Sequence, residues 1–432
     1  MNTKALRQKI LDLAIHGKLV PQDPNDEPAS VLLERIRAEK ERLIKEGKIK
    51  RPKKSKTTSD KPHYENVPFE LPSSWVWCKL HDIIQITNGR SQKYVENVNG
   101  KYPIYGSGGI IGKAVDYLCE AGSTIIGRKG TINNPLFVKE RFWNIDTAFG
   151  MKPMYAISDL YFFYFCQYFD FSKLDKSTAV PSLTQSAIGE VFIPIPPTKE
   201  QKRITDEISY WLGFIDTLES NLINLQLAIK QTKSKILDLA IHGKLVPQYP
   251  TDEPASELLK RINPKAEITC DNGHYQKLPE GWAVCQLDSI ISYEQPTPYI
   301  VKSTDYDDTY TTPVLTAGKS FIIGHTNETN GIYEKLPCII FDDFTTDSKL
   351  VDFPFKVKSS AMKILQVKEN INIEYIAMFM SITRLIGDTH KRYWISEYSK
   401  IEIPIPPKNE QDRIVKKVRL LLNRLGTITE NL

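Results

Sequence analysis

The sequence predicts an α/β protein with two mixed α/β modules separated by two long antiparallel, coiled-coil-like helices, arranged as a circular pseudo-twofold repeat. Three observations predict this fold. A long segment occurs twice, two modules have matching borders but different interiors, and a heptad pattern runs through the centre of the chain. Together they describe one design that the chain uses twice.

The repeated segment is the strongest signal. Residues 9–22 and 235–248 both read KILDLAIHGKLVPQ, and extending the alignment to Ile36 and Ile262 keeps 24 of 28 positions. Chance does not produce such identity, so the chain is a tandem duplication. The repeat mates His16 and His242 lie near predicted helix C-termini, where an imidazole can meet terminal carbonyls.

Two shorter repeats mark the borders of the modules. Residues 71–84, LPSSWVWCKLHDII, return at 278–291 as LPEGWAVCQLDSII, and the IPIPP of residues 193–197 returns at 403–407. The segments between these borders have similar lengths, but their interiors barely resemble each other. Matching borders around different interiors predict two recognition modules of one design that read two different things.

A heptad pattern predicts the long central helix. From Ile204 to Leu239 apolar residues recur alternately after four and three positions, with Thr232 as the exception. The helix should begin near Thr198, after two prolines, and end where Gly243 supplies a left-handed cap. Such a helix of some 45 residues would span roughly 65 Å.

The two ends of the chain predict the partner of this helix. Apolar residues with the same spacing occupy 414–432 and 6–13, and through the repeats Leu432 corresponds to Leu222 and Met1 to Leu227. The terminal helices therefore amount to a second long helix that is broken at the chain ends. We expect an antiparallel pair, termini that meet, and a module at each end.

The module interiors predict mixed α/β structure. The short β-branched runs STIIGR, PCIIFDD, AMKILQV and FIPIPP predict strands, whereas 159–169 and 373–386 predict helices. Gly106–Ala114 resembles a phosphate-binding loop, but its spacing is one residue too long and Ala114 replaces the Ser or Thr that would hold magnesium. We interpret this segment as a flexible loop between strands.

Composition excludes several classes of protein. The six cysteines are scattered without a Cys-x-x-Cys pair, so neither structural zinc nor a disulfide framework is expected, and Cys78 and Cys285 are predicted to be core residues. No apolar run is long enough for a membrane span and the first residues lack a signal-peptide core, so we expect a cytoplasmic protein.

The net charge of the chain is +5. The Lys/Arg-rich tract at 35–61 predicts a solvated linker, and contact with nucleic-acid phosphates is an equally good interpretation.

No catalytic motif emerges. Methyl transfer to a base nitrogen would need an Asn/Asp-Pro-Pro-aromatic motif, and residues 133–137 lack its second proline. The modules instead carry loops rich in side chains that suit base edges and phosphates. These DNA-binding candidates are Arg90, Ser91, Lys93, Tyr105, Ser107, Arg128, Lys129, Asn133, Asn134, Thr178, Ser182, Gln185, Thr316, Lys319, His325, Asn327, Asp342, Asp343, Lys349, Arg392 and Tyr393.

On these residues the chain resembles the DNA-specificity subunit of type I restriction-modification systems. The resemblance covers nearly the whole length and rests on the circular repeat, the Leu-Pro-x-x-Trp and IPIPPxxEQ borders, Gly-Arg-Lys-Gly at 127–130 and Phe-Asp-Asp-Phe-Thr at 341–345. It implies five regions. These are an N-terminal helical segment with a basic linker (1–62), a first target-recognition domain (63–197), a central region with the spacer helix (198–270), a second target-recognition domain (271–407) and a C-terminal helix (408–432).

The resemblance also implies a division of labour. Each target-recognition domain would read one half of a bipartite, asymmetric site in double-stranded DNA, and the helices would set the gap and dock two modification subunits. The chain itself would be non-catalytic and hold no cofactor. S-adenosylmethionine, ATP and magnesium would belong to the modification and restriction subunits. Because a base must leave the stack to be methylated, some of the polar loops would support distorted DNA instead of reading it.

Two other classes of function compete with this interpretation. A protein-interaction scaffold with two modules and no DNA binding would show little sensitivity to salt, whereas DNA binding weakens steeply as salt rises. A stand-alone enzyme would need a cofactor motif that the sequence does not show.

Overall fold

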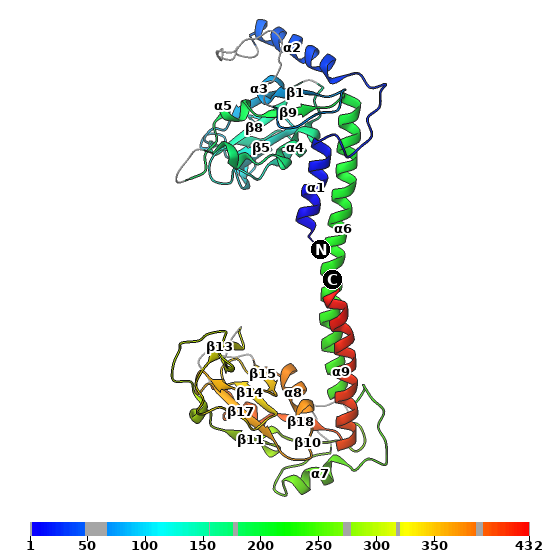
Figure 1. The fold of residues 1–432 in the computed structure, drawn as a ribbon, viewed down its shortest axis with the longest axis vertical. Helices are drawn as coiled ribbons and strands as arrows, with labels where there is room; N and C mark the ends of the chain where they lie inside the picture. Colours follow the sequence, from blue (N-terminus) through cyan, green and yellow to red (C-terminus); the bar gives the residue numbers. More distant parts are fainter. Residues whose placement is uncertain are drawn as a thin grey trace. The chain divides into compact units, whose positions relative to one another are not determined.

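The computed structural model describes residues 2–47, 67–154, 156–175, 180–270, 278–316, 320–385 and 392–431. The chain separates into two compact units, unit 1 (Met1–Asn221) and unit 2 (Leu222–Leu432), and the boundary falls inside the long helix α6 (Thr198–Ile241). The elements of each unit can be followed by colour in Figure 1. Among the described helices, none combines the length and the apolar composition that crossing a membrane requires.

Unit 1 contains helices packed on three small sheets. Its elements are α1 (Thr3–Ile15), α2 (Ala29–Lys45), β1 (Val76–Lys79), α3 (Leu80–Ile83), β2 (Ile84–Asn88), β3 (Tyr102–Gly106), β4 (Gly109–Ala114), β5 (Ser123–Gly127), β6 (Leu136–Val138), β7 (Trp143–Asn144), β8 (Ala148–Pro153), α4 (Asp159–Tyr168), α5 (Gln185–Gly189), β9 (Phe192–Ile195) and the first part of α6. The strand orders are β2-β8-β5-β6, β4-β3-β7 and β1-β9.

Unit 2 repeats this plan. Its elements are the second part of α6, α7 (Ala255–Ile262), β10 (Ala283–Gln286), β11 (Ile291–Glu294), β12 (Thr312–Leu315), β13 (Ile322–Thr326), β14 (Cys338–Asp342), β15 (Ser348–Val351), β16 (Lys356–Val357), β17 (Met362–Val367), α8 (Ile373–Ile382), β18 (Glu402–Ile405) and α9 (Lys408–Glu430). The strand orders are β11-β17-β14-β15, β13-β12-β16 and β10-β18, which match those of unit 1 one for one. The module interiors, whose sequences barely resemble each other, therefore share one topology.

Each unit contains an antiparallel helix pair. In unit 1 the Arg7 guanidinium of α1 lies 2.5 Å from Asp216 of α6, whereas Gln22, further along the chain, reaches back to Glu200 near the start of α6. In unit 2 α9 lies beside the second part of α6, and Gln248 beyond the end of α6 donates to Glu410 at the start of α9. The antiparallel pairing that the sequence predicts is confirmed within each unit.

The heptad positions of α6 are buried to different degrees. Ile204, Ile208 and Ile215 of α6 are fully buried, and the bounds of α6 confirm the predicted start and end. Trp211 and Leu225, which the heptad pattern also includes, are 38% and 40% exposed. At these two positions the heptad pattern therefore does not mark buried residues.

The repeated His-Gly and Leu-Pro-x-x-Trp motifs pack against each other. Gly17 and Gly243 have φ of +67° and +64°, and an added Cβ would lie 2.6 Å from Pro72 Cγ and 2.3 Å from Pro279 Cγ. The positive φ and the missing side chain both require glycine here. In each unit the glycine at the end of the helix therefore packs against the Leu-Pro-x-x-Trp segment that precedes the first strand.

The repeated Glu-Gln motif joins α6 and α9 to the modules. Gln201 donates to the Pro196 carbonyl at 3.0 Å and accepts from the backbone N–H of Ser158 at 2.8 Å, while Gln411 makes the equivalent bonds at 2.9 and 2.8 Å. In both units this glutamine ties the end of a strand to the N-terminus of α4 or α8. The identical bonds explain why EQ follows IPIPP twice.

Burial raises the pKa of the neighbouring Glu200, against the opposing effect of a hydrogen bond from Gln22. The folded state therefore holds this proton more tightly than the unfolded chain, and the contribution of Glu200 to stability falls as pH rises through the raised pKa. We expect Glu200→Gln, which imitates the neutral form, to raise the unfolding temperature at pH 7. The gain should shrink at acidic pH, below the ordinary pKa of 4.5.

Thermal unfolding of wild type and variant at both pH values tests this expectation, with the half-buried Glu207 of the same helix as the Glu→Gln control. An equal effect of Glu200→Gln at neutral and acidic pH would contradict it.

Several local predictions are confirmed and others are not. Strands β5, β9, β14 and β17 lie where the sequence predicts them, and Cys78 and Cys285 are buried, which raises the pKa of both thiols. The predicted helix 373–386 ends at Ile382. The predicted flexible loop 106–114 is a hairpin, in which β3 ends and most of the segment forms β4.

The first part of the basic tract is helical, where the sequence predicts a solvated linker. Its first part belongs to α2, which ends at Lys45, and the remainder to residue 61 lies mostly outside the described residues. The predicted meeting of the chain termini stays a prediction.

Candidate nucleic-acid interface

In unit 1, the ends of three strands bring polar loops to one edge of the main sheet. Strands β2 and β5 both pair antiparallel with β8, which lies between them. Their C-terminal ends therefore lie beside the N-terminal end of β8. We define the unit 1 edge as residues 89–94, 128–134 and 145–147, which adjoin these strand ends.

The backbone fixes Arg90 at this edge while its side chain stays exposed. The Arg90 N–H donates to the Asn144 carbonyl at 2.9 Å, and the Trp143 indole donates to the Arg90 carbonyl at 2.9 Å. At the preceding Gly89, an added Cβ would lie 1.7 Å from the Ile145 carbonyl oxygen. The neighbouring candidates Ser91 and Lys93 are also exposed.

Arg128 and Lys129 follow the C-terminal end of β5, the other strand that flanks β8. The Arg128 N–H donates to the Thr147 carbonyl at 2.7 Å, and Leu183 N–H donates to the Arg128 carbonyl at 2.9 Å. Lys129 forms a bridge with Ser182, which brings a further candidate to the same edge. The Arg128 guanidinium lies over the Phe149 ring, 5.9 Å from its centroid, and is half-buried, whereas Lys129 is exposed. This edge therefore presents a cluster of positive charge.

Other unit 1 candidates have different surroundings. Ser107 lies beside the same edge, because an added Cβ on Gly127 would be 3.1 Å from its Cβ. Tyr105 packs its ring against Phe142 at 5.4 Å, and burial raises its pKa. Asn133 donates to Asp170 at 2.8 Å and accepts from the Phe171 N–H at 2.9 Å, so its amide already holds two chain segments together. Asn134 and Gln185 are exposed, and Thr178 lies outside the described residues.

The corresponding edge of unit 2 has a different chemistry. Strands β11 and β14 flank β17, and the register places Asp343 where unit 1 has Arg128 and Lys363 where it has Phe149. The Asp343 carboxylate accepts from the Trp394 N–H at 2.7 Å and lies 3.3 Å from the Lys363 ammonium, and both side chains are nearly fully buried. Unit 2 thus has a buried, neutralised ion pair where unit 1 has the half-buried cation of Arg128 over Phe149.

Three candidates in unit 2 are corrected by this geometry. Asp342, Asp343 and Tyr393 are only 3%, 2% and 3% exposed. Asp342 accepts from the Phe344 N–H at 3.0 Å and from the Thr345 hydroxyl, and the Tyr393 N–H donates to the Asp343 carbonyl at 3.0 Å. Buried groups with partners inside the unit do not reach base edges, so we remove these three from the candidate set.

The remaining unit 2 candidates are accessible to different degrees. Arg392 is exposed above the Phe344 ring, and Lys349 of β15 is exposed above Phe321. Asn327 is exposed, Thr316 is half-buried, and Lys319 lies outside the described residues. The half-buried His325 lines a hollow of about 520 Å³ on β12 and β13.

Sequence reasoning missed Lys363 and Arg384. Lys363 lies in an apolar strand pattern that predicts a core residue, and only its partner Asp343 reveals its role. Arg384 pairs with Asp347 beside the unit 2 edge, and it follows the end of α8. Both ion pairs join segments that are far apart in the sequence, so spacing alone could not find them.

Gly89 provides a test of how tightly the unit 1 edge is built. We expect Gly89→Ala to disturb the edge by about 1–3 kcal/mol or more, because the added Cβ overlaps the Ile145 carbonyl. Hydrogen exchange of residues 144–148 should accelerate in this variant. Gly108→Ala is the matched control, since an added Cβ there has no atom within 4 Å. Unchanged exchange in Gly89→Ala would contradict the geometry.

Within the described parts of the chain, no group of three or more His, Cys, Asp or Glu side chains is arranged to hold a metal ion. The exposed candidates of the unit 1 edge instead carry cations, hydroxyls and amides, which suit phosphate oxygens and base edges.

Comparison with known proteins identifies similar sequences. The sequence profile described as type I restriction modification DNA specificity domain matches residues 72–227 and 279–432. The specificity subunit of the Escherichia coli type I restriction enzyme EcoR124I/EcoR124II is 45% identical over 170 residues, 37% of this chain and 42% of that subunit. The EcoAI specificity subunit of Escherichia coli is 26% identical over 545 aligned positions, covering 97% of this chain and 89% of that subunit.

The fold has a solved counterpart. A chain from a structure that addresses complex assembly and conformational transition of the type I restriction-modification system superposes with a TM-score of 0.54 at 13% identity. The superposition covers 84% of this chain and 94% of that chain. It supports the architecture independently of sequence identity.

Proposed function

Because the chain belongs to the family of type I restriction-modification DNA specificity proteins, we propose that its two units read the two halves of one bipartite DNA site. In this family the specificity subunit is the non-catalytic part of a complex with other restriction-modification subunits and DNA. The geometry of the two edges supports the assignment of one half-site to each unit.

One observation carries this proposal. The two units share strand order and the hydrogen bond that anchors the edge, from Leu183 to Arg128 at 2.9 Å and from Tyr393 to Asp343 at 3.0 Å. The side chains on this shared backbone differ in charge. A common frame with different side chains at the same place suits two readers of different base sequences.

The unit 1 edge supplies groups for both kinds of DNA contact. Arg90 and Arg128 are held by their backbones at the ends of β2 and β5, the two strands that flank β8, so their guanidinium groups can be directed at guanine O6 and N7. Lys129 and Ser182 border them and suit phosphate oxygens, which fix register without reading sequence. In unit 2, Arg392 and Lys349 are the exposed cations of the candidate set.

The repeated frame is the proposed docking surface for two modification subunits. Arg203 pairs with Asp26 at 2.6 Å and Arg413 with Asp252 at 2.7 Å, so the segment after the repeat is fixed in the same way in each unit. Two similar surfaces suit two copies of one partner. S-adenosylmethionine, ATP and magnesium would be bound by the modification and restriction subunits, and a cytoplasmic location follows from the DNA substrate.

Methylation mapping tests the function. Cells that carry this chain with its candidate modification subunit should show N6-methyladenine in a bipartite motif that is absent without the chain. Absence of a new motif despite an active modification subunit would contradict the proposal. It would favour the protein-interaction scaffold, whose binding, unlike that of a DNA reader, should change little with salt.

The helix α6 gives a separate prediction about the gap between the half-sites. Deleting seven residues within 215–228 removes about two helical turns while keeping the heptad phase, and shortens the helix by about 10 Å. We expect the unread gap to shorten by about three base pairs, at about 3.4 Å each, with both half-sites unchanged. The same mapping measures this, and an unchanged gap would contradict the role of α6 as the spacer.

A further inference from the structure

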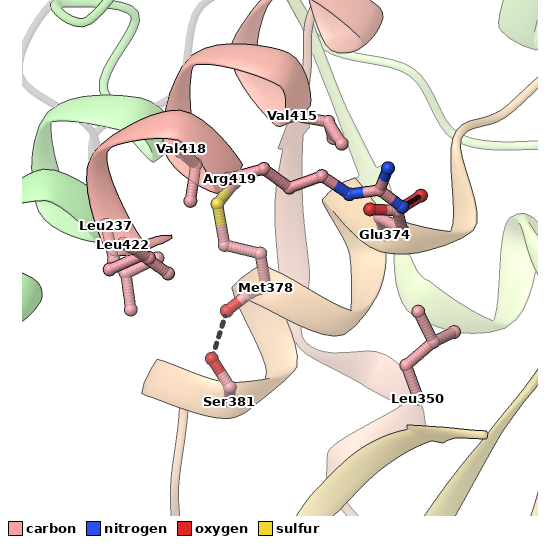
Figure 2. A pocket seen from close by; sticks show the side chains of 9 residues that line it. All are labelled: Leu237, Leu350, Glu374, Met378, Ser381, Val415, Val418, Arg419 and Leu422. Carbon is pink, nitrogen blue, oxygen red and sulfur yellow. Dashed lines mark hydrogen bonds and ion pairs between the residues drawn. The ribbon is translucent and has the colours of Figure 1, made fainter. Parts of the chain in front are cut away.

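Unit 2 contains an open apolar cavity between helices α8 and α9. Its volume is about 240 Å³, and the second part of α6 and strand β15 complete its walls. Figure 2 shows Met378, Val418 and Leu422 grouped on one side of the cavity and Leu350 on another. At the rim, Arg419 of α9 pairs with Glu374 of α8. This cavity plays no part in the proposed DNA contacts.

The duplication supplies an internal comparison for this cavity. Tyr161 donates to the Pro194 carbonyl at 2.7 Å and Tyr375 donates to the Pro404 carbonyl at 2.8 Å, so α4 and α8 correspond residue by residue. Phe163 and Tyr164 of unit 1 therefore correspond to Ala377 and Met378 of unit 2.

The walls of the cavity correspond as well. The equivalent glutamines Gln201 and Gln411 align α6 with α9, so Ser209 corresponds to Arg419. The strand pairing places Phe137 of β6 where Leu350 lies in β15.

In unit 1, aromatic rings occupy the corresponding place. The Phe137 and Phe163 rings are 5.4 Å apart, and the Phe163 and Tyr164 rings are 5.6 Å apart. The Tyr164 hydroxyl hydrogen-bonds the Ser209 hydroxyl at 2.9 Å, and Tyr164 is only 7% exposed. Unit 1 thus fills with its own rings the space that unit 2 leaves open.

The size and lining of the cavity suit one aromatic ring. An apolar protein cavity of about 150 Å³ is large enough to bind benzene. A cavity of about 240 Å³ therefore accommodates the ring of a phenylalanine or tyrosine side chain together with the group attached to the ring. The flexible Met378 can adapt to such a ring and contact it with its sulfur. Because Arg419 and Glu374 neutralise each other at the rim, the site favours an uncharged group.

We propose that this cavity is a docking pocket for one phenylalanine or tyrosine side chain of a protein partner that binds unit 2. Aromatic anchors that fill a pocket dominate many protein interfaces. The inference rests on the proposed function, which supplies the partner, the modification subunit. It makes the two units unequal as docking surfaces, because unit 1 already holds its own rings.

The first test uses p-cresol, an analogue of the tyrosine side chain, and the full-length chain. We expect saturable binding with a Kd on the order of 1 mM, measured by ligand-observed NMR. The double variant Ala377→Phe with Met378→Tyr, which copies unit 1 into unit 2, should weaken binding at least tenfold. The reciprocal variant, Phe163→Ala with Tyr164→Met, should create a second site.

Binding of p-cresol to the wild-type chain decides whether the pocket exists. No saturable binding of p-cresol, or equal binding to the Ala377→Phe, Met378→Tyr variant, would overturn the pocket. Circular dichroism of each variant checks the fold, and the unit 2 variant suffices if the unit 1 variant unfolds.

The second test uses the complex with the modification subunit. A partner side chain in the pocket should abolish p-cresol binding in the assembled complex, and the unit 2 variant should weaken assembly about tenfold or more. Equal p-cresol binding in the complex and in the free chain would overturn the docking of a partner side chain. A complex that never assembles would contradict the proposed function instead, so the two failures are distinguishable.

Discussion

Lys363→Met is expected to lower the free energy of unfolding of unit 2 by about 3–5 kcal/mol, because it leaves the buried Asp343 carboxylate without its cation. The Lys363 ammonium lies 3.3 Å from Asp343 and also bonds the Ser360 carbonyl at 3.2 Å. The loss should appear first at the unit 2 edge, where Asp343 accepts from the Trp394 N–H. Urea denaturation combined with hydrogen exchange resolved by peptide measures it in each unit separately.

Two controls isolate the buried charge. Lys335→Met removes an exposed ion pair with Glu294 and should change the free energy of unfolding by about 0–1 kcal/mol. Adding Asp343→Asn to Lys363→Met removes the uncompensated charge and should recover part of the loss. A small effect of Lys363→Met, equal to that of Lys335→Met, would contradict the claim that Lys363 neutralises a buried Asp343 carboxylate.

Arg128→Ala is expected to weaken DNA binding by the assembled complex about 10- to 100-fold and to relax the sequence requirement in one half-site only. A good bidentate contact between arginine and guanine contributes about 1–3 kcal/mol of discrimination. The hydrogen bonds that join Arg128 to Thr147 and Leu183 are made by the Arg128 backbone. The edge should therefore stay folded when the side chain is removed. Competition binding against a panel of half-site variants, at a stated salt concentration, measures both effects.

The matched control is Arg141→Ala. Arg141 is also in unit 1 and is 49% exposed, but it pairs with Glu120 away from the edge. This variant should bind DNA with the wild-type sequence preference. If Arg128→Ala instead lowers affinity equally for all sequences, Arg128 contacts phosphate and does not read a base.

The frame was predictable because its signals are local or repeated. Fourteen identical residues, a glycine cap and a heptad pattern each predict one piece of structure, and the two copies confirm each other. Trp211 is exposed although its heptad neighbours Ile208 and Ile215 are buried, because the pattern alone does not tell how completely the facing helix covers each position. Similarly, the glycines of 106–109 suggest flexibility, whereas pairing of β3 with β4 makes a hairpin.

The edges were predictable only in part. Arg90, Arg128 and Lys129 follow strand ends, and the sequence places them correctly at loops. Asp342 and Asp343 lie at the end of a strand in the same way, but the partners of the buried Asp343, Lys363 and Trp394, are distant in the sequence. The shared topology of the two interiors is likewise set by strand pairing between distant segments, and no sequence pattern within either interior reveals it.

The central claim is that two units of one design read two different half-sites. Exchange of one module tests this claim most directly. Residues 71–197 would be replaced by the corresponding module of a relative with a known site, and N6-methyladenine would be mapped in cells with the modification subunit. We predict a bipartite motif in which one half is new and the other half and the gap are unchanged. A change in both halves would contradict independent reading by the two units.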